Sequence, residues 1–307
     1  MKKILWPLVL LKRRIISAYY SYIGKHNPKK LVNIRYRDHF GKDMNWEKPK
    51  TLNEKILWLE FNTDTTDWTR LADKYTVREY IESLGLSDIL VKLYGKWDRA
   101  EDIDWNSLPD KFVMKVNNGS GDVLICNDKT RLNIEKETKK FKKLVKKRFG
   151  YTTAESHYIA IKPCIIAEEL LDANKQAVET SSLIDYKIWC FNGNPESIWA
   201  CYNRTHDSVE VATYDLEWNF HPEYSVFTDH YIRAKQLLPK PKSLQQMLDI
   251  AAKLSTGFPE VRVDLYEVDG KPYFGEMTFS SNYGMMDFYT QQYQEYLGSK
   301  VTIKNGK

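Results

Sequence analysis

Two short segments near the C-terminus constrain the fold most, because together they have the pattern of a β-hairpin. Residues 261–266 (VRVDLY) and 273–278 (YFGEMT) contain apolar residues that alternate with polar or charged ones, as in half-buried strands. Asp269-Gly270 lies between them, and this dipeptide is a strong signal for a hairpin turn. The sequence therefore predicts two antiparallel strands here.

The length of the turn decides which side chains share a face. A two-residue loop would put Asp264 and Glu276 on opposite faces, each mixed with apolar side chains. A three-residue loop, residues 268–270, pairs Arg262 with Glu276 and separates the polar from the apolar face. It also pairs Asp264 with Phe274. We therefore predict the three-residue loop, with a core face of Val261, Val263, Leu265, Tyr273 and Met277 and a polar face of Arg262, Asp264, Glu276 and Thr278.

The polar face has the residues of a magnesium and phosphate site. Mg²⁺ prefers oxygen ligands and is usually bound through one or two carboxylates together with substrate phosphates. Arg262 could bind the phosphate, because a guanidinium donates to two oxygens and stabilises charge on a transferring phosphoryl group. The alternative is structural: Arg262 pairs with Glu276 across the strands, and Asp264 is solvated. The hairpin alone does not decide between the two.

A glycine-containing turn upstream follows a strand that carries Lys115. Residues 112–116 and 123–126 predict two strands around the turn 117–122. Lys115 could neutralise nucleotide phosphates, with the backbone amides of the turn on the other side. Because no G-x-x-x-x-G-K-[ST] is present and a strand follows, this is not a Walker loop. The turn by itself is more typical of an ordinary hairpin.

Two further segments add charged residues in an informative order. Residues 165–171 contain Glu168 and Glu169 and could form an adenine-binding hinge, although an edge strand is the simpler interpretation. Lys187, on the next predicted strand, could contact phosphate or pair with Asp185. The order of strand lysine, glycine turn, acidic segment, second lysine, Arg-x-Asp and Glu-x-Thr favours a nucleotide site.

Composition excludes several classes of protein. The 307 residues are enough for two lobes, and 42% hydrophobic with 28% charged residues exclude disordered and collagen-like chains. The net charge of +5 favours anionic partners, and no nucleic-acid partner is expected. The four cysteines are widely spaced, so we expect neither a zinc site nor disulfides, and we expect a cytoplasmic location.

The N-terminal segment is apolar but short. Residues 4–11 contain Pro7 and are followed by three basic residues, 12–14, so the run is far below the roughly 20 residues of a membrane span. The pattern also disfavours a secretory signal. Two alternatives remain equal: a core helix, or an interfacial helix that brings the protein to the inner membrane face as a peripheral contact.

Other segments predict helices. Residues 49–85 and 243–254 have helical periodicity, and residues 129–148 predict a basic amphipathic helix. We expect its lysine-rich face to be solvated; contact with a polyanion or a membrane is the less favoured alternative.

Together these segments resemble the TupA-like branch of the ATP-grasp superfamily, over about residues 34–288. The resemblance is carried by 49–55 (PKTLNEK), 71–80 (LADKYTVREY), 112–122 (FVMKVNNGSGD), 165–171 (IIAEELL), 185–193 (DYKIWCFNG), 261–266 and 273–278. It implies an α+β ATP-grasp fold in which two α+β subdomains clasp ATP. The expected divisions are a helical N-terminal extension, 1–65, a lobe with the glycine loop, 66–164, and a lobe with the metal site, 165–307.

The resemblance also implies roles for individual residues. Lys115 and Lys187 would hold the phosphates of ATP, with Lys115 and Arg262 as catalytic residues. The nucleotide would also contact Ser120, Gly121, Glu168, Glu169 and Leu171. Asp264 and Glu276 would bind Mg²⁺. Many ATP-grasp ligases have Glu-x-Asn where this chain has Glu276-Met277-Thr278, so Thr278 would be a weaker ligand.

The implied reaction joins an amine to a carboxylate. ATP phosphorylates the carboxylate, and the amine attacks the acylphosphate, so the protein needs no covalent nucleophile but must exclude water. The branch is associated with cell-surface polysaccharide synthesis, which implies a uronic acid acceptor and an amino acid or amine donor in capsule or O-antigen assembly. Arg204, His206 and residues 280–283 lie where acceptor contacts are expected, although surface loops are the commoner interpretation.

Two alternative functions come from other classes. Asp102-Ile103-Asp104 has the D-x-D spacing of a sugar-nucleotide glycosyltransferase, but such triplets also arise in acidic loops. The 9 Trp and 20 Tyr residues could form sugar-stacking platforms on a non-catalytic glycan-binding protein, but most aromatic residues are expected in the core.

Overall fold

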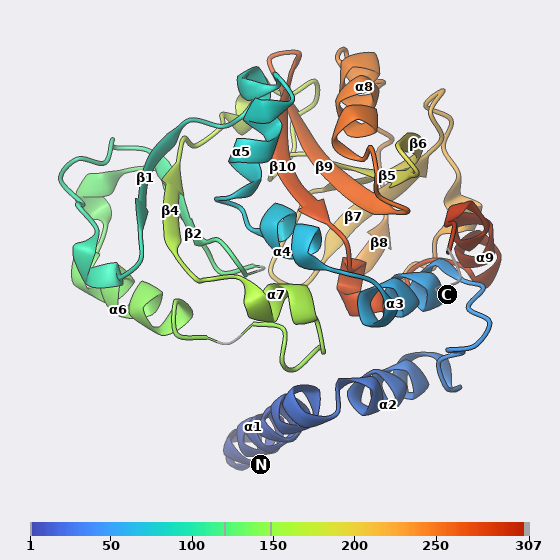
Figure 1. The fold of residues 1–307 in the computed structure, drawn as a ribbon. Coiled ribbons are helices and arrows are strands. Elements are labelled where there is room, and N and C mark those ends of the chain that lie inside the picture. Colours follow the sequence, from blue (N-terminus) through green and yellow to red (C-terminus); the bar gives the residue numbers. More distant parts are fainter. Residues whose placement is uncertain (1, 120, 148, 304–307) are drawn as a thin grey trace.

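Two sheets of different size define two lobes, which lie side by side in Figure 1. The computed structural model describes residues 2–119, 121–147 and 149–303. Helices pack against both sheets, and two N-terminal helices lie below the lobes in the same view. The architecture is the predicted α+β class.

The smaller sheet is antiparallel, with strand order β1-β4-β2-β3. Helix α6 (Ile134–Leu144) covers one of its faces, and Phe141 of this helix is fully buried in a core with Phe112 and Met114. The strands are β1 (Leu93–Trp97), β2 (Phe112–Val116), β3 (Val123–Cys126) and β4 (Ile165–Glu168).

The larger sheet has the order β10-β9-β5-β6-β7-β8 and is antiparallel except for the pair β7 and β8. Helix α8 (Leu244–Leu254), predicted from its periodicity, packs on β5, β6 and β9. The strands are β5 (Asp185–Phe191), β6 (Asn194–Tyr202), β7 (Val209–Tyr214), β8 (Tyr231–Arg233), β9 (Val261–Val268) and β10 (Lys271–Thr278).

The helices predicted within residues 49–85 are three separate elements. Helix α3 (Leu52–Asn62) begins with a reciprocal cap, in which Thr51 Oγ1 accepts from the Glu54 amide at 3.2 Å and Glu54 Oε2 accepts from the Thr51 amide at 3.1 Å. The other two are α4 (Thr66–Ala72) and α5 (Val77–Ser83), and apolar residues of all three join the core of the larger lobe. Two further helices come later in the chain, α7 (Ser156–Ala160) and α9 (Gln291–Lys300).

The two sheets follow each other along the chain, β1–β4 before β5–β10, but the two lobes do not. Strand β4 pairs with β1 and β2 of the smaller sheet, although its residues lie beyond the boundary expected at residue 164. Helices α4 and α5 pack into the core of the larger lobe, although they precede the smaller sheet in the chain. The boundaries expected after residues 65 and 164 stay a prediction about folding units.

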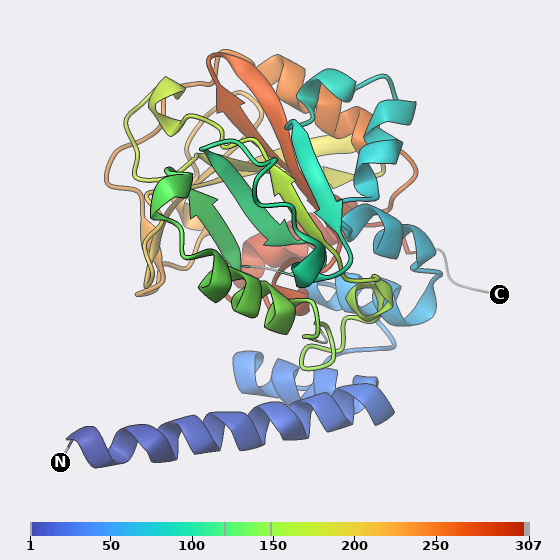
Figure 2. The same cartoon turned by 90° about the vertical axis from the view of Figure 1, so that its left-hand side faces the viewer.

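The N-terminal segment forms a pair of helices, α1 (Lys2–His26) and α2 (Pro28–Phe40). Asn27 begins α2, where its side chain accepts from the Lys30 amide at 3.1 Å, and Gly41 ends it in the left-handed conformation. In Figure 2, α1 is the outermost element and α2 lies between it and the lobes. Among the residues described, there is no helix with the length and apolar character needed to span a bilayer.

Candidate active site

The hairpin of β9 and β10 closes with a two-residue turn, so the predicted three-residue loop is wrong. Val268 pairs with Lys271, and Asp269 and Gly270 between them have φ values of 56° and 70°. Two consecutive left-handed residues are the geometry of a type I′ turn, which matches the right-handed twist of the strands. Asp-Gly supplies both conformations without a third residue.

A β-bulge at Gly275 separates the polar and apolar faces instead. The register shifts between Phe274, which pairs with Leu265, and Glu276, which pairs with Asp264. A Cβ at Gly275 would lie 3.0 Å from the Asp264 carbonyl oxygen, so glycine suits this close approach.

Two of the predicted pairings are wrong, but the predicted polar group is present in the structure. Thr278, rather than Glu276, pairs with Arg262, and Asp264 pairs with Glu276 rather than Phe274. Phe274 replaces Tyr273 in the core, because the two-residue turn pairs Phe274 with Leu265. The four predicted polar residues lie together on one face.

Arg262 is the centre of this group. Its Nε and Nη2 donate to the two oxygens of Asp264 at 2.7 and 2.8 Å. The same Nη2 donates to Thr278 Oγ1 at 3.2 Å, and Nη1 donates to Ser281 Oγ just after β10. The guanidinium is therefore held in one orientation by strands and loop together.

Lys187 enters the group from the neighbouring strand β5, where it pairs with Asp264 in the register. Its Nζ lies 2.5 Å from Asp185 Oδ2 and also donates to Asp264 Oδ2. The structural interpretation of Lys187 as a partner of Asp185 is confirmed, but the ammonium also belongs to the Arg262 group.

Lys74 connects this group to the glycine turn. Its Nζ lies 3.5 Å from Glu276 Oε2 and donates to the Gly119 carbonyl at 2.9 Å. The Lys74 amide also donates to the Asn117 carbonyl at 3.2 Å. Sequence reasoning did not assign Lys74 a role, although it lies within the segment 71–80 that carries part of the family resemblance.

At three charged residues of this group, burial and neighbouring charges shift the pKa in opposite directions. Burial raises the pKa of Asp264 to about 6, although the contacts with Arg262 and Lys187 oppose this shift. Burial alone would raise the pKa of Glu276, but Lys74, Lys187 and Arg262 together lower it below its ordinary value. Burial alone would lower the pKa of Lys187, but Asp185 and Asp264 raise it.

The smaller lobe contributes a second ion network around Glu168. Lys115 Nζ lies 2.6 Å from Glu168 Oε2, and Arg78 Nη1 lies 3.3 Å from Glu168 Oε1. Arg78, which sequence reasoning missed, lies on α5 and in the same family segment as Lys74. Glu168 is thus oriented by two cations at the end of β4.

An apolar surface accompanies Lys115 on β3. Val123 pairs with Lys115 and Ile125 pairs with Val113, so these side chains share one face of the smaller sheet. Val123 is 41% exposed and Ile125 60% exposed. All four residues of β3 are apolar, so the sequence alone does not show which of them stay exposed.

The other predicted residues are not drawn into these networks. Ser120 lies outside the described residues, and Gly121 has a φ of 82° in the turn. Glu169 and Leu171 follow β4, where the Glu169 amide donates to the Lys92 carbonyl at 2.9 Å. Arg204 and His206 lie in an exposed loop after β6.

The D-x-D triplet has ordinary structural partners. Asp104 Oδ1 accepts from the amides of Asn106 and Ser107 at 3.1 and 3.3 Å, and Asp102 lies 3.9 Å from Arg99. These contacts form a turn in the smaller lobe.

The oxygen donors of the hairpin fit Mg²⁺ as it is bound together with a nucleotide. Paired strands place the carboxylates of Asp264 and Glu276 beside each other, with the hydroxyl of Thr278 3.2 Å from Glu276 Oε1. Two carboxylates leave coordination positions for phosphate oxygens and water, as Mg²⁺ requires. Within the described ranges, no three or more His, Cys, Asp and Glu residues gather as a metal site that needs no substrate.

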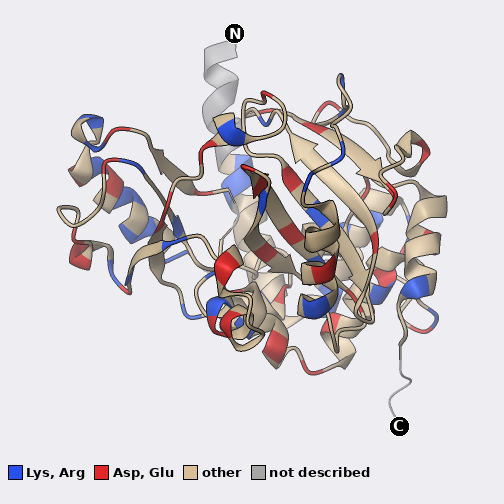
Figure 3. Ribbon diagram, turned by 90° about the horizontal axis from the view of Figure 1, so that it is seen from above, with Lys and Arg blue, Asp and Glu red and all other residues tan. Residues whose placement is uncertain are grey.

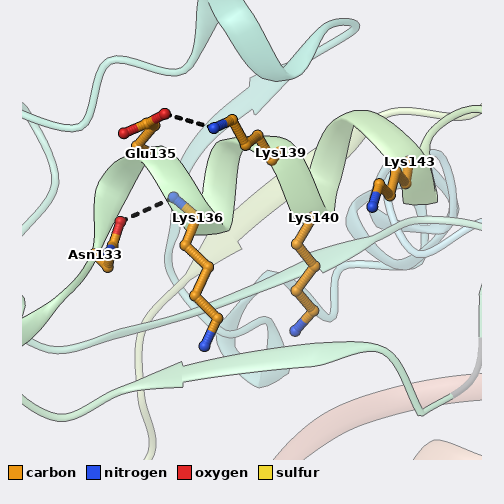
Figure 4. Close-up of a pocket in the computed structure, with 6 residues that line it drawn as sticks. All are labelled: Asn133, Glu135, Lys136, Lys139, Lys140 and Lys143. Atoms are coloured by element: carbon orange, nitrogen blue, oxygen red, sulfur yellow. Dashed lines mark hydrogen bonds and ion pairs between the residues drawn. The ribbon is translucent and has the colours of Figure 1, made fainter.

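A separate hollow of about 460 Å³ lies against α6 (Figure 4). Lysines of this helix and of the residues after it have acidic partners: Lys139 lies 2.5 Å from Glu135, Lys142 pairs with Glu101, and Lys147, just after the helix, lies 3.3 Å from Asp122. These pairs support the predicted solvated face rather than a polyanion site. The hollow is lined by Asn133, Glu135, Lys136, Lys139, Lys140 and Lys143.

Comparison with known families gives one match, over residues 54–302, to the family described as TupA-like ATPgrasp. The resemblance expected from the sequence segments is confirmed, and so is the ATP-grasp fold. The match also supports the expectation of an enzyme of the ATP-dependent ligase class. No curated protein matches the chain.

Similar solved structures are distant in sequence. One is D-alanine–D-alanine ligase from Bacillus anthracis complexed with ATP, with 13% identity, a TM-score of 0.39, and coverage of 68% of this chain and 55% of that one. Phosphoribosylamine–glycine ligase from Thermotoga maritima has 13% identity and a TM-score of 0.40, with coverage of 68% and 48%. ATP-grasp ligase PsnB, with precursor peptide PsnA2 and AMPPNP, has 11% identity and a TM-score of 0.38, with coverage of 92% and 73%. The chain thus spans about half the length of the first two ligases.

Proposed function

The chain belongs to the TupA-like ATP-grasp family, and we propose that it is an ATP-dependent ligase that joins an amine or amino acid to a uronic acid carboxylate. The product would enter capsular, O-antigen or a related polysaccharide. The observation that carries the proposal is the position of Lys74, which contacts both the glycine turn and Glu276. The residues that would bind phosphate and those that would bind metal are therefore connected across the two lobes.

In this proposal, the smaller lobe holds the nucleotide. Val123 and Ile125 would contact the adenine, because an exposed apolar surface beside a lysine suits a flat ring joined to phosphates. Lys115 would turn from Glu168 toward the phosphates. Gly121 and the rest of the turn would cover them with backbone amides and exclude water.

The larger lobe would perform the phosphoryl transfer. Lys187 would exchange part of its contacts with Asp264 for phosphate oxygens, while Arg262 would keep its own. Arg262 is fixed by Asp264, Thr278 and Ser281, so it can stabilise developing charge on the transferred group without reorganisation. Asp264 and Glu276, with Thr278, would hold Mg²⁺, which supplies charge neutralisation to the phosphates.

The substrate carboxylate attacks the γ-phosphorus, and the bond from that phosphorus to the β–γ bridging oxygen breaks, with ADP as the leaving group. The amine then attacks the acyl carbon and releases phosphate. The protein residues contribute position, charge and exclusion of water at each step, and no covalent enzyme intermediate is needed.

Release of ADP in the presence of candidate substrates tests this function. The protein is incubated with ATP, Mg²⁺, a panel of uronic acids and mixed amino acids, and ADP, phosphate and coupled product are measured. ADP release that requires both a carboxylate and an amine, with a matching amide product by mass spectrometry, would support the proposal. Release of UDP from a sugar nucleotide, or sugar binding without turnover, would instead favour one of the alternative functions.

Arg131→Met offers a matched control for substitutions of Arg262. Arg131 is an exposed arginine that lies 3.1 Å from Asp128, far from the hairpin in sequence. The control should retain full turnover with any substrate pair that the unaltered protein accepts.

A further inference from the structure

Helix α1 carries a stripe of large apolar side chains that are exposed. Leu11, Ile15, Tyr19 and Tyr22 are each more than half exposed, and Ile16 beside them is also exposed. The spacings of four, four and three residues place the first four on one face of the helix. We call these four residues the α1 stripe.

The α1 stripe is not the face by which the helix packs on the protein. Ile23 is buried with residues of α2, and a Cβ at Gly24 would lie 1.8 Å from the Tyr151 carbonyl oxygen, so this other face contacts the body closely. Figure 2 shows α1 along the outside of the molecule. The stripe therefore faces away from the packed side of the helix.

The charge of the protein is concentrated in the same region. Residues 1–42 contain 11 of the 46 Lys and Arg but only one of the 41 Asp and Glu, so this segment carries +10 and the rest of the chain −5. In Figure 3, basic and acidic residues are interspersed over both lobes. The net positive charge of the whole protein thus comes from the helices α1 and α2 and their flanking residues.

Basic residues border the α1 stripe on both sides. By helical rotation, Lys12 lies on one side of the stripe, and Arg14 and Lys25 lie on the other. Long basic side chains beside an exposed apolar face can reach lipid phosphates while the apolar residues enter the acyl region. Tyrosine is also suited to the boundary between water and lipid.

We propose that α1 binds lengthwise to the surface of a bilayer that contains anionic lipid. The α1 stripe enters the interface, and the charge of +10 binds acidic headgroups, each nearby Lys or Arg adding to the attraction. The lysine-bearing α6 is not the contact, because acidic residues pair with several of its lysines. The proposal does not depend on the ligase activity.

Co-sedimentation with vesicles tests the proposal. The intact protein is mixed with phosphatidylcholine vesicles with or without 30% phosphatidylglycerol, at low and high salt. We expect binding to the anionic vesicles, and at least a tenfold weaker partition coefficient without phosphatidylglycerol or at high salt. Absence of binding to the anionic vesicles would overturn the proposal without the need for a variant.

A pair of double variants tests the stripe itself. Ile15→Glu with Tyr19→Glu should weaken partitioning at least tenfold, whereas Gln246→Glu with Gln292→Glu, which changes the charge equally at exposed positions of α8 and α9, should leave it within about twofold. Equal loss in both variants, or no loss in the first, would overturn the role of the stripe. So would a stripe-dependent dimer in sedimentation velocity without vesicle binding, since it would assign the stripe to a second copy of the chain.

Discussion

The two sides of the candidate active site are built from different interactions. On the hairpin of the larger lobe, charged side chains neutralise one another in a nearly closed network, in which Asp264 is only 1% exposed. On the smaller lobe, Lys115 is 22% exposed and lies beside two exposed apolar residues, Val123 and Ile125. One side pairs most of its charges internally without a ligand, and the other presents surface that a ligand can cover.

This difference indicates how the work is divided between the lobes. Buried ion networks are expensive to desolvate and are weak evidence for stability, so a network held on three paired strands suggests a requirement for fixed orientation. An exposed apolar face gains free energy when a flat ring covers it. We therefore expect Arg262 of the larger lobe to determine the rate of phosphoryl transfer and the apolar face of the smaller lobe to contribute to nucleotide affinity alone.

Arg262→Lys should have the largest effect, because it keeps the charge but removes the two-pronged contact with Asp264. We expect kcat to fall about 10²–10³-fold, as when a preorganised donor is lost from a transition state. Steady-state kinetics measures this effect, with circular dichroism to show that the variant is folded. A folded variant with kcat within threefold of the unaltered protein would contradict the assigned role.

Lys74→Met should change both the nucleotide affinity and the rate, since Lys74 contacts residues of both lobes. We expect KM for ATP to rise about tenfold or more, with a smaller fall in kcat, because one charged contact contributes roughly 1.5–3 kcal/mol. Lys92→Met, at an exposed lysine of the smaller lobe, is the control. If both variants raise KM equally, the contacts of Lys74 with the two lobes have no specific role in nucleotide binding.

Glu260→Gln tests a buried carboxyl group of the larger lobe, just before β9. Within the part of the chain that is described, both carboxylate oxygens of Glu260 lack a hydrogen-bond partner, and burial raises the pKa of this group well above its ordinary value, although Arg262 opposes the shift. The folded protein therefore retains a proton that the unfolded chain releases above pH about 4.5, so stability falls as pH rises from there by up to about 1.4 kcal/mol per unit.

Glutamine cannot ionise and should remove this pH dependence. Urea unfolding at pH 5 and pH 8 should show that Glu260→Gln gains stability over the unaltered protein as pH rises. A constant difference between the two proteins at both pH values would show that Glu260 is ionised in the folded state.

Ile125→Ser should have the smallest effect and should act on affinity alone. Ile125 is exposed in the free protein, so its replacement should cost little stability but lose about 1 kcal/mol of apolar contact with the nucleotide, or about fivefold in affinity. Fluorescence titration with an ATP analogue measures the change, with Ile134→Ser on α6 as the control. Unchanged affinity in Ile125→Ser would remove the apolar face from the nucleotide site.

Sequence patterns predicted much of this arrangement because they are local. The alternation in residues 261–278 placed the four polar residues of the hairpin on one face, and the glycine turn was found between its two strands. The bulge at Gly275 was missed, because it depends on the approach of a backbone from the opposite strand.

Contacts between distant segments were not predictable in the same way. Lys74 precedes a helix and has no periodic signal that connects it to Glu276, 202 positions later. The N-terminal segment was left as either a core or an interfacial helix, since only the packed structure shows which side chains of α1 stay exposed.

Titration calorimetry with a non-hydrolysable ATP analogue tests the central claim most directly. The account predicts one bound nucleotide per chain, with affinity that falls at least tenfold when Mg²⁺ is omitted or when Glu276 is replaced by Ala. Binding that is indifferent to both changes, or no binding at all in the presence of Mg²⁺, would contradict a magnesium–nucleotide site between Lys115 and the Arg262 hairpin.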